Sequence, residues 1–145
     1  MDYQRTVQPN GFIFSKRSLN NLKGVHPDLV KVVARTLELT VQDFLVNEGL
    51  RTQQRQQQLL VKGKSKTLNS RHLTGHAVDL IPYPVNGDFD EDGILNIDDW
   101  DQYYPIANAM KEAARELGVP VEWGGDWKSI LDGPHFQLPW KEYPK

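Results

Sequence analysis

The stretch SRHLTGHAVDL, Ser70 to Leu80, places two histidines and an aspartate around the start of an apolar segment. If residues 76–83 form a strand, its side chains alternate between two faces, and Asp79 then shares a face with a small alanine while His76 points away. His72 precedes a glycine, in a turn that can fold back over the end of this strand. We therefore predict that His72 and Asp79 converge and that His76 does not join them.

The segments on either side of this strand show apolar residues at the spacing of helices or of strands. Helices are predicted for residues 26–40, 52–63 and 103–118, with Pro27 in the first turn of the first helix and Gly118 as the stop signal of the last. Further strands are predicted for residues 43–48, 119–123 and 135–139. This order predicts a single α+β domain over residues 1–145, with a small antiparallel sheet packed against helices.

Composition excludes several classes of protein. The 145 residues carry a net charge of −2, which gives no reason to expect nucleic acid or membrane insertion. There is no cysteine, so a metal site must use His, Asp, Glu or backbone oxygen. The N-terminal residues lack the order of a signal peptide, and no apolar run reaches transmembrane length, so we expect a protein that is made in the cytosol and stays there until it is released.

A third ligand is needed for a catalytic zinc site, which uses three protein ligands and one open position. His135 opens a predicted strand after the turn-forming DGP, where its side chain can project into a cleft, and we take it as the third ligand. Asp132, held in the same turn, is placed to act as the general base. His26 and His76 are interpreted as structural or surface histidines.

The motifs around these residues resemble a known family of zinc peptidases. SRHLTGHAVDL fits the pattern S-x-H-x-x-G-x-A-x-D, and DGPH, EGLRT and WGGDW follow the family's other segments in the right order. The family includes VanY-type D,D-carboxypeptidases and bacteriophage L-alanyl-D-glutamate endopeptidases, with a Hedgehog/D-Ala-D-Ala-peptidase-like fold. The resemblance covers residues 25 to 138.

The resemblance implies roles for individual residues. It implies zinc at His72, Asp79 and His135, with Asp132 as general base for a metal-activated water. Arg51 would bind substrate or stabilise charge at the scissile carbonyl; the alternative is an exposed charge at the start of a helix. Ser70 would contact substrate, or act as a turn-stabilising hydroxyl. Three tryptophans near the motifs either line the cleft or pack in the core: Trp123, Trp127 and Trp140.

A second metal signal lies in DFDEDGILNIDD, residues 88–99, which fits an EF-hand calcium loop. The predicted ligands are Asp88, Asp90, Asp92, the carbonyl of Ile94, and Asp99. Asp99 replaces the usual glutamate, so affinity should be modest, and the other interpretation is a solvated acidic loop. Calorimetry at millimolar calcium tests this prediction, and an absence of binding heat would leave only the acidic loop.

The function that the resemblance implies is that of a monomeric phage endolysin. It would cut the L-alanyl-D-glutamate bond of peptidoglycan stems after leaving the host cytoplasm for the cell wall. Two alternatives remain open at this point. One is a D,D-carboxypeptidase that removes terminal D-alanine, and the other is a non-catalytic, zinc-stabilised binding module.

Overall fold

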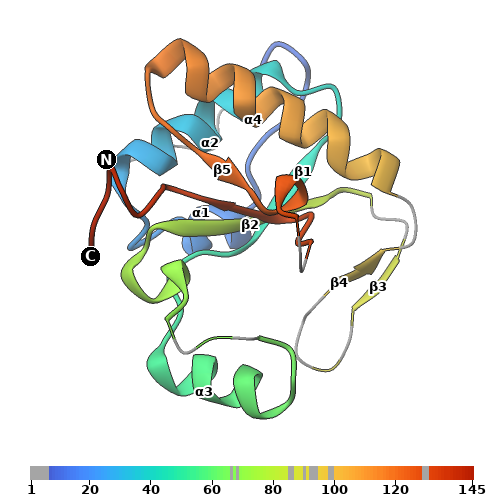
Figure 1. The fold of residues 1–145 in the computed structure, drawn as a ribbon. Helices are drawn as coiled ribbons and strands as arrows, with labels where there is room; N and C mark the ends of the chain where they lie inside the picture. The colour runs from blue at the N-terminus through green and yellow to red at the C-terminus, as the bar shows by residue number, and fades with distance from the viewer. Residues whose placement is uncertain are drawn as a thin grey trace.

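A computed structural model describes residues 7–65, 67, 69–84, 87–89, 91, 95–97, 100–128 and 131–145. Its centre is a four-stranded antiparallel sheet with the order β1-β2-β6-β5 (Figure 1). The strands are β1 Phe44–Glu48, β2 Ala77–Pro82, β5 Glu122–Trp123 and β6 His135–Gln137. A separate two-stranded hairpin pairs β3 Gly87–Phe89 with β4 Leu95–Ile97. The predicted α+β class with a small antiparallel sheet is therefore confirmed.

The described part of the chain contains four α-helices. They are α1 Lys16–Asn21, α2 Pro27–Leu39, α3 Gln53–Val61 and α4 Tyr103–Leu117. Three 3₁₀ turns complete the described elements: η1 Arg71–Thr74, η2 Trp100–Gln102 and η3 Gly124–Asp126. In Figure 1, α2 and α4 lie together on one side of the sheet, whereas α3 lies on the other. The short helix α1 was not predicted, because its six residues are mostly polar and show no apolar repeat.

The ends of α2 and α4 follow local rules. Pro27 occupies the first turn of α2, and the Nδ1 atom of His26 accepts a hydrogen bond from the backbone N–H of Asp28. Gly118 closes α4 with φ 67°, a conformation that favours glycine. His26 is thus a helix cap, in agreement with the structural role predicted for it.

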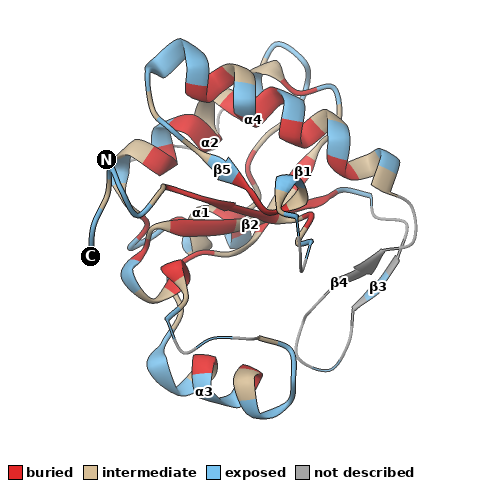
Figure 2. Cartoon of the chain, in the orientation of Figure 1, coloured by how far each residue is buried: buried red, intermediate tan, exposed pale blue. Residues whose placement is uncertain are grey.

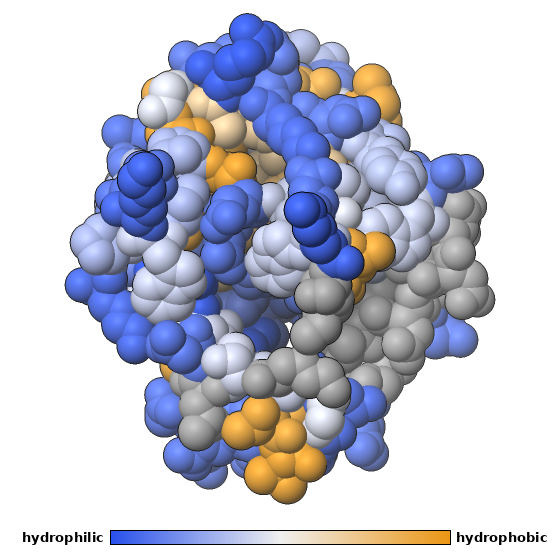
Figure 3. Space-filling view, in the orientation of Figure 1, coloured by the Kyte–Doolittle hydropathy of each residue, from blue (hydrophilic) through white to orange (hydrophobic). Residues whose placement is uncertain are grey.

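The core lies between the sheet and the two long helices. The buried faces of α2 and α4 turn towards the sheet and towards each other, as the red surfaces in Figure 2 show. Leu29, Val33 and Leu37 supply the α2 face, and Ile106, Met110 and Ala113 supply the α4 face. This burial stabilises the sheet that carries the candidate site. The face of the molecule in Figure 3 is mostly hydrophilic, with an apolar area over α3, where Val61 is 87% exposed. Within the described residues, no helix is both long and apolar enough to cross a bilayer.

A buried guanidinium joins the C-terminal segment to the centre of the fold. Arg71 is 2% exposed; its Nε and Nη2 donate to the carbonyl of Leu138 at 3.1 and 3.0 Å, and Nη2 also donates to the carbonyl of Tyr143. Its guanidinium carbon lies 4.2 Å from the ring centroid of Trp140. Arg71 therefore supplies the hydrogen bonds that the carbonyls of Leu138 and Tyr143, after β6, would otherwise accept from water.

We predict that Arg71→Leu lowers the free energy of unfolding by about 2–4 kcal/mol, because it removes charge-assisted hydrogen bonds to buried carbonyls. Urea titration followed by circular dichroism measures the change. Arg115→Leu is the control, since Arg115 is exposed and its ion pair is with Glu112 on its own helix. Equal effects from the two substitutions would contradict this role for Arg71.

Candidate metal centre

Two neighbouring strands and one turn bring three metal-ligating side chains together. Asp79 in β2 is the direct cross-strand partner of His135 in β6. His72 lies in η1, which ends at Gly75 with φ 74°. A Cβ atom at Gly75 would lie 2.2 Å from the carbonyl oxygen of Gly24, so a side chain there would collide with backbone. This close turn carries His72 back over the start of β2.

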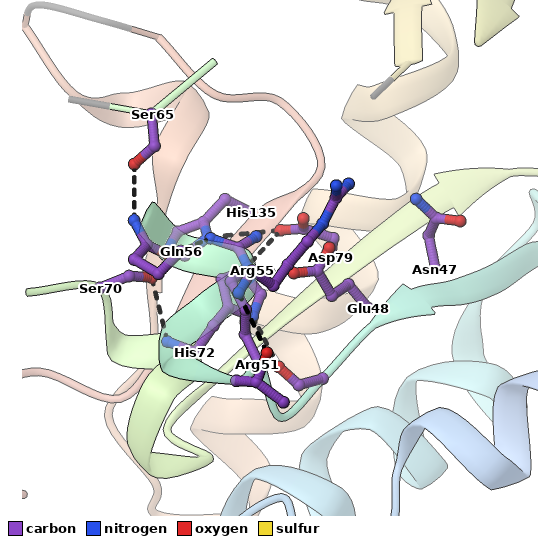
Figure 4. Close-up of polar contacts among 12 residues, drawn as sticks. Asn47, Glu48, Arg51, Arg55, Gln56, Ser65, Ser70, His72, Asp79 and His135 are labelled. Carbon is purple, nitrogen blue, oxygen red and sulfur yellow. Dashed lines mark hydrogen bonds and ion pairs between the residues drawn. The ribbon is translucent and has the colours of Figure 1, made fainter. Parts of the chain in front are cut away.

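The three side chains lie close together on one face of the sheet, at its two central strands β2 and β6. His72 Nε2 is 3.2 Å from Asp79 Oδ1, and His135 Nδ1 is 3.3 Å from the same oxygen (Figure 4). One ligand atom from each residue lies within 4.8 Å of the others. Both histidines are buried, and Asp79 is half-buried. Among the described residues, this is the one group of three that could hold a metal ion.

The spacing of these atoms fits a small tetrahedral cation. Bonds of 2.0–2.1 Å at tetrahedral angles separate neighbouring ligand atoms by about 3.3 Å, which matches the two distances to Asp79. Two neutral imidazoles and one carboxylate are also donors that suit zinc. His72 Nδ1 lies 2.8 Å from the carbonyl oxygen of Gly49, which orients the ring and leaves Nε2 directed at Asp79.

Burial and neighbouring charges shift the pKa values of Asp79 and His135. Burial raises the pKa of Asp79, but the charges and hydrogen bonds of His72 and His135 outweigh it, so that pKa lies far below its ordinary value. Burial lowers the pKa of His135, but its hydrogen bond to Asp79 and the nearby negative charges raise it overall. A cation bound here would compete with these protons for the same lone pairs.

Asp132 lies outside this group of three but close to it. Its backbone N–H donates to the carbonyl of Gly124 at 3.1 Å, and its own carbonyl accepts from the N–H of His135 at 3.2 Å. Burial and the negative charge of Asp79 raise the pKa of Asp132 to about 6, although nearby positive charges, including Arg51, oppose this. The pKa of Asp132 is therefore close to neutrality, as a proton acceptor in a reaction at neutral pH requires.

Arg51 lies beside the candidate metal ligands and is not an exposed charge. Its side chain is 8% exposed and forms an ion pair with Glu48, and its Nη1 donates to Gln56 Oε1 at 2.7 Å (Figure 4). Its backbone N–H donates to the carbonyl of His72 at 2.9 Å. The alternative of a surface charge at a helix start is therefore wrong. Sequence reasoning missed Glu48 and Gln56, since neither contact follows from local spacing.

Ser70 and the tryptophans have distinct surroundings. Ser70 caps η1, where its Oγ accepts from the N–H of His72 at 3.2 Å, as expected of a turn-stabilising hydroxyl. Trp123 is a core residue that stacks on Phe136. Trp127 is half-buried, with its ring centroid 5.3 Å from that of His135. Trp127 is thus the tryptophan that borders the candidate centre, whereas Trp140 packs on Arg71.

Two further sequence predictions have different outcomes. His76 lies apart from the centre, with Nδ1 2.5 Å from Thr74 Oγ1 and its ring 5.6 Å from that of His26. Of the predicted calcium ligands, Asp90, Asp92, Ile94 and Asp99 lie outside the described residues. Asp88 is exposed and stands opposite Asn96 in the β3–β4 hairpin. Calcium binding therefore stays a prediction from the sequence.

Comparison with known proteins shows close relatives. The family model described as phage L-alanyl-D-glutamate peptidase matches residues 10–138. The L-alanyl-D-glutamate peptidase of Escherichia phage T5 is 35% identical, over 88% of this chain and 98% of that protein. The peptidoglycan L-alanyl-D-glutamate endopeptidase CwlK of Bacillus subtilis is 32% identical, over 66% of this chain and 60% of its own length. The crystal structure of the Serratia marcescens L-Ala D-Glu endopeptidase ChiX superposes with a TM-score of 0.79 at 49% identity, covering 91% of this chain and 93% of that one.

Proposed function

The chain belongs to the phage L-alanyl-D-glutamate peptidase family, and from this premise we propose that it is a zinc-dependent endopeptidase of bacterial peptidoglycan. It would cut the bond between L-alanine and D-glutamate in the peptide stems. His72, Asp79 and His135 would hold the zinc ion. The observation that carries this proposal is the convergence of these three side chains, with ligand spacing that suits zinc.

Each residue around the candidate centre would have a separate role in hydrolysis. When bound, zinc polarises a carbonyl oxygen and lowers the pKa of a coordinated water to about 7. Asp132 would accept the proton of the attacking water and deliver it to the leaving amine. Arg51, held by Glu48 and Gln56, would place its positive charge near the substrate carbonyl. Ser70 would contact substrate in addition to capping η1.

The relatives favour this activity over the two alternatives. All the relatives described above are named as L-alanyl-D-glutamate peptidases or endopeptidases, not as D,D-carboxypeptidases. A purely structural zinc site would leave no role for Asp132, a carboxyl beside the three candidate ligands that could accept a proton. We further propose that one monomeric domain carries the activity and acts on the wall after release from the host cytoplasm.

Digestion of purified peptidoglycan tests the proposed bond specificity. We expect new N-terminal D-glutamate, detected by mass spectrometry, and its loss after treatment with a zinc chelator. Released D-alanine would instead indicate a D,D-carboxypeptidase. Binding to the wall without new termini would indicate the binding module.

The contact between Gly124 and Asp132 gives a further prediction. A Cβ atom at residue 124 would lie 2.3 Å from the carbonyl oxygen of Asp132 and 2.9 Å from its Cβ. Gly124→Ala should therefore displace Asp132 and lower kcat/KM for a stem peptide by about 100-fold while zinc stays bound. Gly118→Ala is the control for backbone strain alone, because its φ of 67° disfavours alanine but the added methyl meets no atom within 4 Å. If both variants cleave at the parent rate, the placement of Asp132 does not depend on Gly124.

A further inference from the structure

The Nε2 atom of His135 faces the side chain of Gln137, which has no role in the mechanism proposed above. His135 Nε2 lies 2.8 Å from Gln137 Oε1, while its Nδ1 is directed at Asp79. We propose that Gln137, oriented by Glu122, is a positioning residue that keeps the proton of His135 on Nε2 and so leaves Nδ1 free for the metal. This inference rests on the proposed zinc site.

The strand register explains why these three side chains meet. His135 and Gln137 are two residues apart on β6 and therefore share a face of the sheet. Glu122 on β5 is the direct cross-strand partner of Gln137, and Ala77 on β2 is its partner on the other side. Direct partners have Cβ atoms about 5 Å apart, within reach of a glutamine and a glutamate. The short alanine on β2 leaves the glutamine free to lie towards β5.

The carboxylate of Glu122 fixes the direction of the amide. An ionised carboxylate can only accept hydrogen bonds, and Gln137 Nε2 donates to Glu122 Oε1 at 3.2 Å. The amide nitrogen therefore faces β5, and the amide oxygen faces His135. Since that oxygen can only accept, it favours the tautomer of the neutral imidazole with the proton on Nε2, and it competes with Asp79 Oδ1, which would accept a hydrogen bond from Nδ1. The carboxylate of Glu122 therefore sets the donor and acceptor of both hydrogen bonds, the one to Gln137 and the one between Gln137 and His135.

The two ligand histidines are fixed in opposite tautomers by different means. His72 Nδ1 faces the backbone carbonyl of Gly49, which also can only accept, so that ring carries its proton on Nδ1. His135 depends on a side chain that substitution can remove. Gln137 is 8% exposed and His135 is 6% exposed, so water does not readily replace the lost acceptor. Without it, His135 can adopt the other tautomer, whose Nδ1 proton would occupy the position that the metal needs.

The test compares zinc affinity and imidazole protonation in matched variants. Gln137→Leu is expected to weaken zinc binding about 10–100-fold, measured by competition with a chromogenic chelator. Side-chain ¹⁵N spectra of the metal-free protein, at a pH where the rings are neutral, should show the proton of His135 leaving Nε2. The nitrogen signals of His72 should stay unchanged, which gives an internal control.

A second glutamine controls for the loss of an amide. Gln42 is half-buried, and its Nε2 donates to the carbonyls of Asp43 and Tyr83, each at 3.0 Å. Neither residue belongs to the candidate centre, so Gln42→Leu should leave zinc affinity unchanged. An equal loss of affinity in Gln42→Leu and Gln137→Leu would overturn the positioning role.

Exchanging the two residues keeps the direction of the hydrogen bonds. In the double variant Gln137→Glu/Glu122→Gln, the carboxylate at position 137 accepts a hydrogen bond from His135. The amide at position 122 donates a hydrogen bond to that carboxylate. We expect zinc affinity within about threefold of the parent, even if Gln137→Leu fails to fold. A double variant that folds but binds zinc 10-fold or more weakly would overturn the inference, as would parent-like affinity in Gln137→Leu. A parent protein that binds no zinc would instead refute the proposed metal site.

Discussion

Asp79→Ala should remove both zinc binding and peptidoglycan hydrolysis, with a fall in rate of at least about a thousandfold. Asp79 is the one anionic residue of the three candidate ligands, and both histidines direct a ring nitrogen at its Oδ1. Without it, two neutral imidazoles would face a divalent cation with no compensating charge, while catalytic zinc sites use three protein ligands. Zinc content by mass spectrometry and the release of new amino termini from peptidoglycan measure the two effects.

The same stretch of sequence supplies the control for this prediction. His76 lies three residues before Asp79, but its ring contacts Thr74 and His26 and not the candidate centre. His76→Ala should retain zinc and keep its rate within about threefold of the parent, because it changes no ligand. Loss of zinc from His76→Ala, or full activity in Asp79→Ala, would mean that the metal is held elsewhere.

Local patterns were sufficient to predict the elements that carry the three ligands. Alternation over residues 76–83 predicts β2 and places Asp79 on the face that meets His135, and helical spacing predicts α2 and α4 within one or two residues. The convergence of His72 with Asp79 follows from a glycine turn of the kind that sequence reveals. These signals are local, so they do not depend on knowing which strands pair.

Side-chain contacts between different elements could not be predicted in the same way. Arg51 is buried beside Glu48 of β1 and Gln56 of α3, and only the folded chain brings these side chains together. Gln137 could have been noticed two residues after His135, but its role depends on the pairing of β5 with β6. The hydrogen bonds of Arg71 reach Leu138 and Tyr143, which lie 67 and 72 positions away in the sequence. Arg51 and Arg71 are therefore charged residues whose burial cannot be predicted before their partners are known.

Asp132→Asn should lower hydrolysis by about 10²–10⁴-fold and leave zinc binding nearly unchanged. The amide has almost the same shape as the carboxyl but cannot accept the proton of the attacking water. Asp132 also lies outside the three residues whose ligand atoms converge, so the metal should remain. Asp132→Glu keeps a carboxylate and should retain more activity than Asp132→Asn. Zinc titration and kcat/KM for a stem peptide separate the two effects.

The pH profile gives a second measure of the same residue. A general base works when it is deprotonated, so activity should fall as pH falls through the pKa of Asp132. Burial and the charge of Asp79 raise that pKa to about 6 without a metal, and the positive charge of bound zinc would lower it. The acidic limb of kcat/KM should therefore lie at or below about pH 6, and it should be missing from the residual rate of Asp132→Asn. Loss of zinc by protonation of the histidines produces a similar limb, so zinc occupancy must be measured at each pH. If Asp132→Asn keeps the limb at constant occupancy, the proton acceptor is another group.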